Sequence, residues 1–238
     1  MKILAIETAT EGCSVALWLD GEVCERFEVA PRGHAARVLP WAEALLAEAG
    51  VSRSALDVIA VGRGPGAFTG VRLAVAIGQG LAMGLDIPLL GISSLAAMAQ
   101  AASGQRIVAA IDARMREVYV GHFERDASGL MRAVGEELLL SPDRVTAPVG
   151  AGWRGVGSGF AAEDGLLSRR LSGCLDSIDP IALPRATAVA LLAADQRAVD
   201  DAGPPESVAP AYLRNQVALT LSEQQAKRAS AQARNSDK

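Results

Sequence analysis

The sequence predicts an α/β protein that is built from two similar halves. In the first hundred residues, apolar strands and helices follow one another in the order βββαβα, and the second half again begins with three strands. In each half the first strand ends in an acid, and the next strand begins six residues later, so that Leu4-Ala-Ile-Glu7 corresponds to Ala109-Ala-Ile-Asp112. Such a repeat indicates an internal duplication. A chance match is the alternative, because the matched positions are few.

The first half opens with three strands and a helix. The strands are predicted at Lys2–Glu7, Cys13–Leu19 and Glu22–Val29, and Asp20-Gly21 between the last two is a strong signal for a type I′ hairpin. A helix follows over His34–Ala49, where apolar residues recur with helical spacing and a glycine stands just beyond the end.

A glycine-rich loop joins the next strand to the next helix. The strand is Val58–Gly62, the loop is Gly64–Gly70, and the long apolar helix runs to Gly84. A strand over Pro88–Ile92 and a helix over Ser93–Ala102, with the Ser93 hydroxyl as its N-cap, complete this half.

The second half has weaker patterns after its first two strands. Its predicted elements are strands at Ile107–Ile111, Val118–Glu124 and Met131–Leu140, a short helix at Pro142–Thr146, a glycine-rich strand exit at Gly155–Gly159, and a helix at Ala186–Val199. A turn at Ser103-Gly104 marks the boundary. We therefore expect an N-terminal lobe over 1–103 and a C-terminal lobe over 104–220, whose last segment can pack back on the first lobe. A polar, disordered tail is expected over 221–238.

Composition excludes several classes of protein. Half of the 238 residues are hydrophobic and the net charge is −4 without any block of Lys and Arg, which argues against strong binding of nucleic acid by this chain alone. The three cysteines, Cys13, Cys24 and Cys174, are far apart, which argues for reduced thiols. The apolar run Leu73–Leu85 is interpreted as too short and too glycine-rich to span a bilayer, and no signal core precedes the first strand. We expect a soluble, cytoplasmic protein.

The glycine loop does not carry a complete nucleotide motif. No Lys follows Gly70, as a Walker A loop requires, and the strand after the loop ends without the acid of a dinucleotide site. A structural turn that allows close packing is favoured. Metal and serine hydrolysis are also disfavoured, because His34 and His122 have no second ligand at suitable spacing and Ser158 does not lie in G-x-S-x-G.

Glu7 and Asp112 are the best candidates for binding Mg²⁺ or a nucleotide between the two halves. Each acid ends a strand before a turn, where a carboxylate could hold a metal ion and turn amides could hold phosphate. Against this hypothesis, the turn Ala113–Glu117 has no Gly, Ser or Thr to donate, and acids are common in turns generally.

The helix after the glycine loop is apolar on every side. One face can rest on a sheet, and the other needs a second helix or another subunit. Ala74, Gly78 and Ala82, at spacings of four, would let that neighbour approach closely. The helix at His34–Ala49 also has more apolar surface than one sheet face covers.

Five segments in order along the chain resemble the bacterial TsaB family, also called YeaZ. They are Ile3–Thr8, the loop Gly64-Pro-Gly-Ala-Phe-Thr-Gly-Val-Arg72, Gly91–Leu95, Ile111–Tyr119 and Pro210-Ala-Tyr-Leu-Arg214. The resemblance implies an actin-like (ASKHA, ribonuclease-H-like) duplicated fold of two lobes. It also implies a role in making tRNA threonylcarbamoyladenosine, as the non-catalytic partner of the paralogue TsaD. TsaD carries the metal and transfers the threonylcarbamoyl group, the ATPase TsaE joins the assembly, and tRNA is reached only through the complex.

The resemblance also bears on the sites. The metal histidines of TsaD form H-x-x-x-H in the segment that matches Ser94–Met98 here, so this chain is expected to have no metal site, no cofactor and no catalytic residue. First-lobe helices pack against the partner in this family, over an area on the order of 800 Å² per partner. Without the partner, the same surface is expected to form a homodimer. The residues expected at this interface are Val38, Trp41, Leu45, Leu73, Ala74, Ile77 and Leu81.

Two other functions stay open at this point. One is an actin-like ATPase or kinase in its own right, which would use Glu7 and Asp112. The other is a protease, a label that relatives of this family have attracted.

Overall fold

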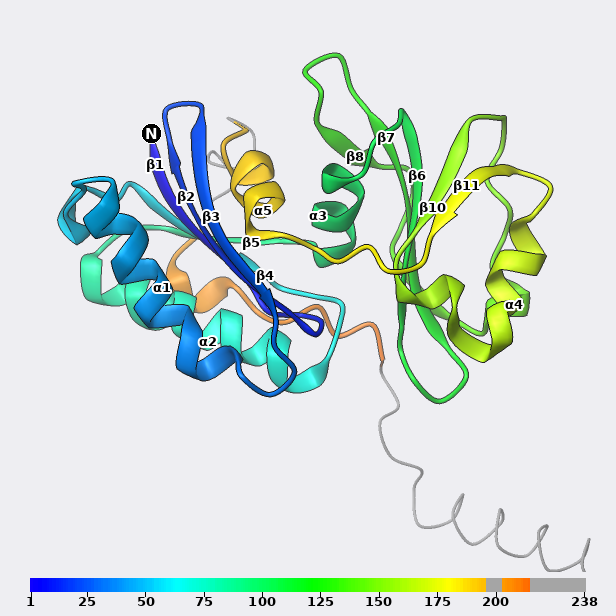
Figure 1. Ribbon diagram of the computed structural model, residues 1–238, viewed down its shortest axis with the longest axis horizontal. Helices are drawn as coiled ribbons and strands as arrows, with labels where there is room; N and C mark the ends of the chain where they lie inside the picture. Colours follow the sequence, from blue (N-terminus) through cyan, green and yellow to red (C-terminus); the bar gives the residue numbers. More distant parts are fainter. Residues whose placement is uncertain (196–202, 215–238) are drawn as a thin grey trace, which may run out of the picture.

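Two β-sheets with the same strand order form the framework of the protein (Figure 1). The computed structural model describes residues 1–195 and 203–214. The first sheet has the order β3-β2-β1-β4-β5, with β1 antiparallel to β2 and parallel to β4. Its strands are β1 (Lys2–Glu7), β2 (Gly12–Leu19), β3 (Glu22–Val29), β4 (Val58–Gly62) and β5 (Leu89–Ile92).

The second sheet repeats this arrangement. Its order is β11-β10-β6-β7-β8, with β6 antiparallel to β7 and parallel to β10. Its strands are β6 (Arg106–Asp112), β7 (Val118–Arg125), β8 (Met131–Ala133), β9 (Leu138–Leu140), β10 (Trp153–Val156) and β11 (Leu175–Asp179). Strand β6 takes the place of β1, β7 that of β2 and β10 that of β4, so the predicted duplication is confirmed.

Three features of the second half differ from the prediction. The single strand expected at Met131–Leu140 is two short strands, β8 and β9, which both pair with β7. Gly135 between them has φ +87°, a conformation that ends a strand readily. Helix α4 (Ala162–Leu171) and strand β11 were not predicted at all. The short helix expected at Pro142–Thr146 is a 3₁₀ turn, η2 (Pro142–Arg144).

Helices cover both faces of each sheet. Helices α1 (His34–Glu48) and α2 (Phe68–Leu85) pack on one face of the first sheet, and α5 (Ala186–Ala193) packs on the other. On the second sheet, α3 (Ser94–Ala101) covers one face and α4 the opposite face. Helix α3 begins as predicted, because the Ser93 hydroxyl accepts hydrogen bonds from the amides of Leu95 and Ala96.

The two central helices are exchanged between the sheets. Helix α3 follows the last strand of the first sheet but packs on the second, and α5 follows the last strand of the second sheet but packs on the first. The two helices contact each other between the sheets (Figure 1). A division into lobes at 1–103 and 104–220, which we keep as a proposal, therefore places each of these helices over the sheet of the other lobe.

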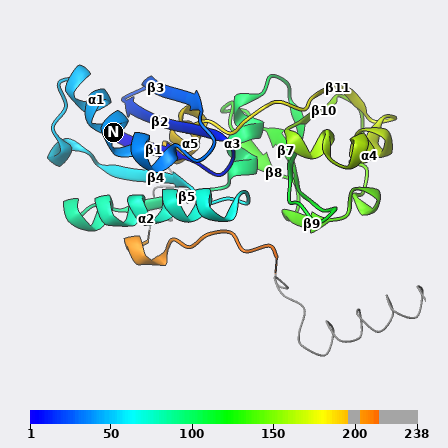
Figure 2. The same ribbon diagram turned by 60° about the horizontal axis from the view of Figure 1, so that its bottom comes forward.

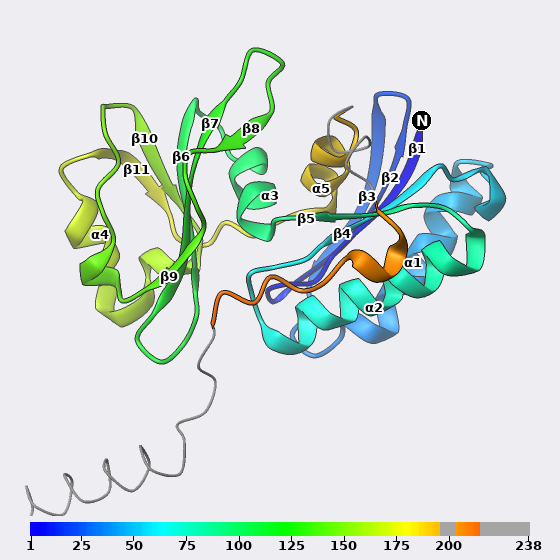
Figure 3. The same cartoon turned by 180° about the vertical axis from the view of Figure 1, so that it is seen from behind.

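A C-terminal segment runs along α2 toward the second sheet (Figures 2 and 3). We call residues 203–214 the strap. It begins at the free edge of the first sheet, where Gly203 forms a bridge with Leu89, and it contains the 3₁₀ turn η4 (Pro205–Ser207). The predicted tail over 221–238 and the end of the helix predicted at Ala186–Val199 lie outside the described residues.

Within the described part of the chain, α2 is the one helix that meets length and hydropathy limits for a membrane span. It has 18 residues and a mean hydropathy of 1.3. The helix is longer than the apolar run Leu73–Leu85 on which the sequence argument rests, because it begins at Phe68. An apolar helix that covers a sheet meets the same limits, and α2 packs on β4 of the first sheet.

Candidate functional site

Glu7 ends β1 with its side chain turned into the protein. The residue is fully buried, Oε1 accepts a hydrogen bond of 2.6 Å from the Ala9 amide, and Oε2 accepts one of 2.7 Å from the Ser94 hydroxyl. Burial raises the pKa of the Glu7 carboxyl above its ordinary value, although these hydrogen bonds act in the opposite direction. A Cβ atom at Gly62 would lie 1.9 Å from Oε2, so the backbone of β4 closes over the carboxyl group.

The glycine loop packs against the end of β1. A Cβ atom would lie 2.3 Å from the carbonyl oxygen of Ala9 if built at Gly66, and 2.0 Å from that of Thr8 if built at Gly70. The Thr8 hydroxyl donates a hydrogen bond of 2.7 Å to the Gly70 carbonyl. These glycines are therefore needed for close approach of the backbone, which supports the interpretation of the loop as a structural turn.

Asp112 ends β6, at the position equivalent to Glu7, but its surroundings are different. Its amide donates a hydrogen bond of 3.1 Å to the Ser158 hydroxyl. Its carboxylate accepts one of 2.7 Å from the Arg114 amide and forms an ion pair of 3.1 Å with the Arg114 guanidinium group. This guanidinium group is exposed, and Asp112 itself is only partly buried.

A cleft of about 1250 Å³ lies between the two lobes, and Asp112 lines it. The start of α2, the β6–β7 turn and the end of the strap also contribute to its walls. Glu7 is fully buried under the backbone of β4 and does not line the cleft. The structure therefore does not bring the Glu7 and Asp112 carboxyl groups together, and of the two only Asp112 lines the cleft.

Sequence reasoning from chemistry missed the aromatic and basic groups of this cleft. The Arg72 guanidinium group lies 3.2 Å from the ring centre of Phe68 and 5.0 Å from that of Tyr212. Arg72 also donates a hydrogen bond of 2.9 Å to the Tyr212 hydroxyl. Arg72 and Tyr212 are 140 residues apart, so no local pattern could pair them.

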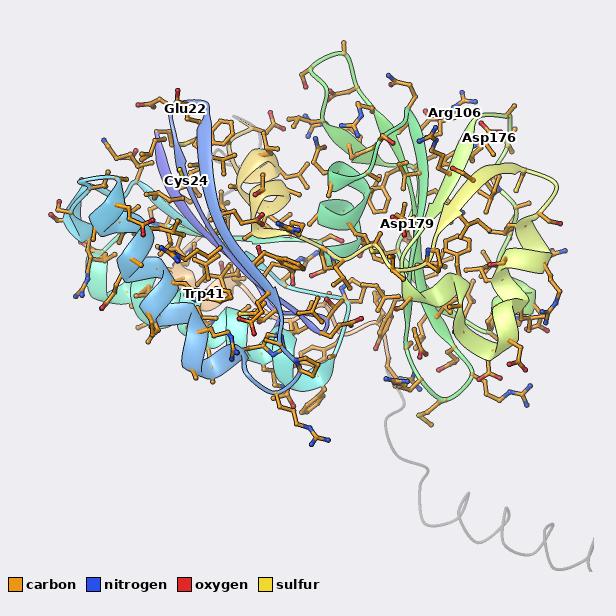
Figure 4. The ribbon with its side chains drawn as sticks, in the orientation of Figure 1. Glu22, Cys24, Trp41, Arg106, Asp176 and Asp179 are labelled. Atoms are coloured by element: carbon orange, nitrogen blue, oxygen red, sulfur yellow. The ribbon has the colours of Figure 1, made fainter. Side chains whose placement is uncertain are left out.

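The histidines and cysteines do not form a site. His122 packs edge-on against Trp153 at 5.7 Å, and burial lowers the pKa of its imidazole. Within residues 1–195 and 203–214, no three His, Cys, Asp or Glu side chains gather where they could hold a metal ion. The thiol of Cys13 is buried, which raises its pKa to about 11, while Cys24 is exposed on the edge strand β3 (Figure 4).

Comparison with known proteins identifies the family. A family model described as TsaD, tRNA N6-adenosine threonylcarbamoyltransferase, matches residues 28–154. The tRNA threonylcarbamoyladenosine biosynthesis protein TsaB of Escherichia coli K12 is 41% identical over 225 residues, which cover 92% of this chain and 96% of that protein. The chain belongs to the TsaB family. The protein of the same name from Haemophilus influenzae KW20 is 38% identical over 230 residues, or 91% of this chain and 95% of that protein.

Solved structures of TsaB-like proteins have the same fold. YeaZ from Pseudomonas aeruginosa gives a TM-score of 0.83 at 44% identity, and covers 89% of this chain and 99% of its own. A second structure from that organism, described as an uncharacterized protein with similarity to peptidase YEAZ, gives 0.83 at 43% identity, with 90% and 99% covered. These likenesses and the duplicated sheets confirm the actin-like two-lobe fold.

The residues proposed for the partner interface of this TsaB-family chain fall into two groups. Val38, Leu45 and Ala74 are at most 3% exposed and belong to the core of the first lobe, so they are corrected from interface to core positions. The other four, Trp41, Leu73, Ile77 and Leu81, are half-buried. Figure 4 shows Trp41 on α1, the helix beside α2 on this side of the sheet.

The small residues that open α2 to a neighbour are not those expected. Ala74 and Ala82 are buried, and a Cβ atom at Gly78 would lie 2.4 Å from the Val61 side chain, so this stripe faces the chain's own sheet. A second stripe with the same spacing, Ala76-Gly80-Gly84, is exposed. A Cβ atom at Gly80 or Gly84 would meet nothing within 4 Å. We define the outer face of α2 as Leu73, Ala76, Ile77, Gly80 and Gly84.

Proposed function

We propose that this chain is the non-catalytic subunit of a complex that makes tRNA threonylcarbamoyladenosine. In this role it binds and activates the catalytic paralogue TsaD. Its TsaB relatives are named for this biosynthesis, and the chain matches a TsaD family model over 28–154. Its own strand-end acid Glu7 is fully buried and hydrogen-bonded to Ser94, which occupies a position where TsaD is expected to hold its metal. TsaE is the proposed third component, and tRNA is proposed to be bound only through the complex.

The observation that carries this proposal is the outer face of α2. Its five residues are apolar or glycine, and none of them is charged. The neighbouring helix α1 adds Leu39, which is 45% exposed, and the half-buried Trp41. A helix of a partner can approach such a surface closely, because glycine and alanine keep the backbone accessible. A homodimer through the same face is proposed when TsaD is absent.

The test is a binding experiment with TsaD of the same organism. Size-exclusion chromatography with light scattering is expected to show a homodimer that exchanges into a one-to-one complex when TsaD is added. Ala76→Glu is expected to lower the affinity for TsaD at least tenfold, because it places a charge in an apolar interface. Ala101→Glu, at the exposed end of α3, is the matched control and should bind normally. The proposal would be contradicted if the wild-type protein did not bind TsaD. It would also be contradicted if a folded Ala76→Glu variant bound TsaD with unchanged affinity.

A nucleotide-binding function is the second candidate, because Asp112 and Arg72 line a cleft of sufficient size. A protein that binds MgATP should gain several degrees in melting temperature at concentrations well above its dissociation constant. A scaffold without such a site should not. The protease alternative is not favoured, because neither His34 Nε2 nor His122 Nε2 forms a hydrogen bond with Ser158 in this structure.

A further inference from the structure

The strap is fixed to the first lobe along α2. The Val208 side chain packs with the core of the first lobe, and its carbonyl oxygen accepts a hydrogen bond of 3.0 Å from the amide group of Gln79 on α2. Three residues later, the Ala211 amide donates one of 2.8 Å to the Arg63 carbonyl, just beyond β4. Tyr212 then stacks on Arg72 of α2. This part of the strap is therefore held at several points of one helix and one strand end.

The last described residue of the strap is fixed to the second lobe. The Arg214 guanidinium group forms an ion pair of 2.8 Å with Glu117 and donates a hydrogen bond of 3.0 Å to the Ala113 carbonyl. The Arg214 side chain is only 15% exposed. Partial burial makes such a charge-assisted contact stronger than a surface ion pair, because water competes less for both groups.

The turn that Arg214 holds has an unfavourable backbone. Arg114, Met115 and Arg116 are consecutive and have φ values of 60°, 56° and 63°. Each of these left-handed conformations costs about 1–2 kcal/mol in a residue other than glycine. The contacts of Arg214 with Ala113 and Glu117, at the two ends of this turn, therefore compensate for part of that cost.

We propose that the strap couples the β6–β7 turn of the second lobe to helix α2 of the first. The six residues that follow Val208 span at most about 20 Å when extended, and no helix or strand among them can lengthen. A widening of the interlobe cleft that takes up the slack of these six residues must therefore either break the Arg214 contacts or pull on α2. The coupling links the cleft, which the end of the strap lines, with the outer face of α2. This inference concerns the chain alone and does not depend on the proposed partner.

Hydrogen exchange measured by mass spectrometry on the full chain, at one protein concentration, tests the coupling. In Arg214→Ala, amide exchange is expected to become at least threefold faster both in the 113–117 turn and in residues 68–79 of α2. The matched control is Arg116→Ala, which removes a cation of the same turn that pairs with Glu163 inside the second lobe. In the control, exchange of α2 should not change.

A second variant tests the coupling from the opposite end. Gln79→Ala removes the hydrogen bond to the strap without touching the second lobe, and coupling between two regions is reciprocal. Exchange in the 113–117 turn is expected to accelerate in this variant as well. The proposal would be overturned if Arg214→Ala accelerated exchange only in the 113–117 turn and Gln79→Ala accelerated it only in α2. It would also be overturned if Arg116→Ala accelerated exchange in α2 as much as Arg214→Ala does. If Arg214→Ala does not fold, the Gln79→Ala result alone decides.

Discussion

Glu7 and Asp112 end equivalent strands of the duplicated lobes, yet only one of them faces the interlobe cleft. Glu7 is fully buried and hydrogen-bonded to Ser94, whereas Asp112 lines the cleft and pairs with the exposed Arg114. The two acids share a backbone position within the repeat. They do not share an environment, and the environment decides what a carboxyl group can do.

The elements that follow each strand explain the difference. In the first lobe, Gly62 at the end of β4 lets the backbone pass directly over the Glu7 carboxyl group, and α3 places Ser94 within hydrogen-bond distance of it. In the second lobe, the turn after Asp112 is left-handed and opens toward solvent. A repeated motif therefore predicts where the backbone goes more reliably than it predicts which acid remains available for binding.

The largest loss of stability is expected when a methyl group is added next to the buried Glu7 carboxyl group. In Gly62→Ala the new Cβ atom would lie 1.9 Å from Oε2 of the buried carboxyl group. We expect the free energy of unfolding to fall by about 3 kcal/mol or more, because the site is closely packed and its hydrogen bonds must shift. Urea denaturation measures this change.

Two further variants test the cause of this loss. Gly80→Ala is the control, since a Cβ atom there meets nothing within 4 Å, and it should stabilise the helix by up to about 1 kcal/mol. The double variant Gly62→Ala, Glu7→Ala should lose much less stability than the sum of the two single variants, because removing Glu7 removes the clash. If the losses of the two single variants added up to that of the double variant within about 0.5 kcal/mol, Gly62 would be needed for a reason other than the contact with Glu7.

A smaller effect is expected when the two acids themselves are removed. Glu7→Ala leaves the buried Ala9 amide and the Ser94 hydroxyl without an acceptor, so it should cost about 2–4 kcal/mol of unfolding free energy. Asp112→Ala removes an ion pair with an exposed guanidinium group and should cost less than about 1 kcal/mol. Chemical denaturation of both variants gives the two values. Equal losses would mean that the acids play the same structural role after all.

Local patterns in the sequence predicted the first lobe well. The hairpin at Asp20-Gly21, the N-cap Ser93 and the alternation of strands and helices all depend on residues close together in the chain, and the structure confirms them. Helix α4 was missed because it has only ten residues and contains Gly165 in its first turn, where Glu163, Asp164 and Gly165 adopt left-handed conformations.

Features that depend on distant residues could not be predicted in the same way. The stripes Ala74-Gly78-Ala82 and Ala76-Gly80-Gly84 have the same spacing on α2, and only packing on the sheet shows which one faces outward. The burial of Glu7 depends on Gly62 and Ser94, which lie far along the chain. Helical spacing identifies faces of a helix, but the neighbours of each face are a property of the whole fold.

The buried Glu7 should also make the free energy of unfolding depend on pH. Burial raises the pKa of Glu7 above its ordinary value of 4.5, so the folded state binds more protons than the unfolded state in the pH range between these two pKa values. The stabilisation that belongs to the neutral carboxyl group is present below pH 4.5 and is lost as the pH rises through the folded-state pKa. Glu7→Gln keeps a neutral side chain at every pH. Its unfolding free energy relative to wild type should therefore increase as the pH rises from 4.5 to the folded-state pKa, by at most about 1.4 kcal/mol per pH unit. Urea titrations of both proteins across this range measure the difference, and a constant value would mean that Glu7 remains charged in the folded protein.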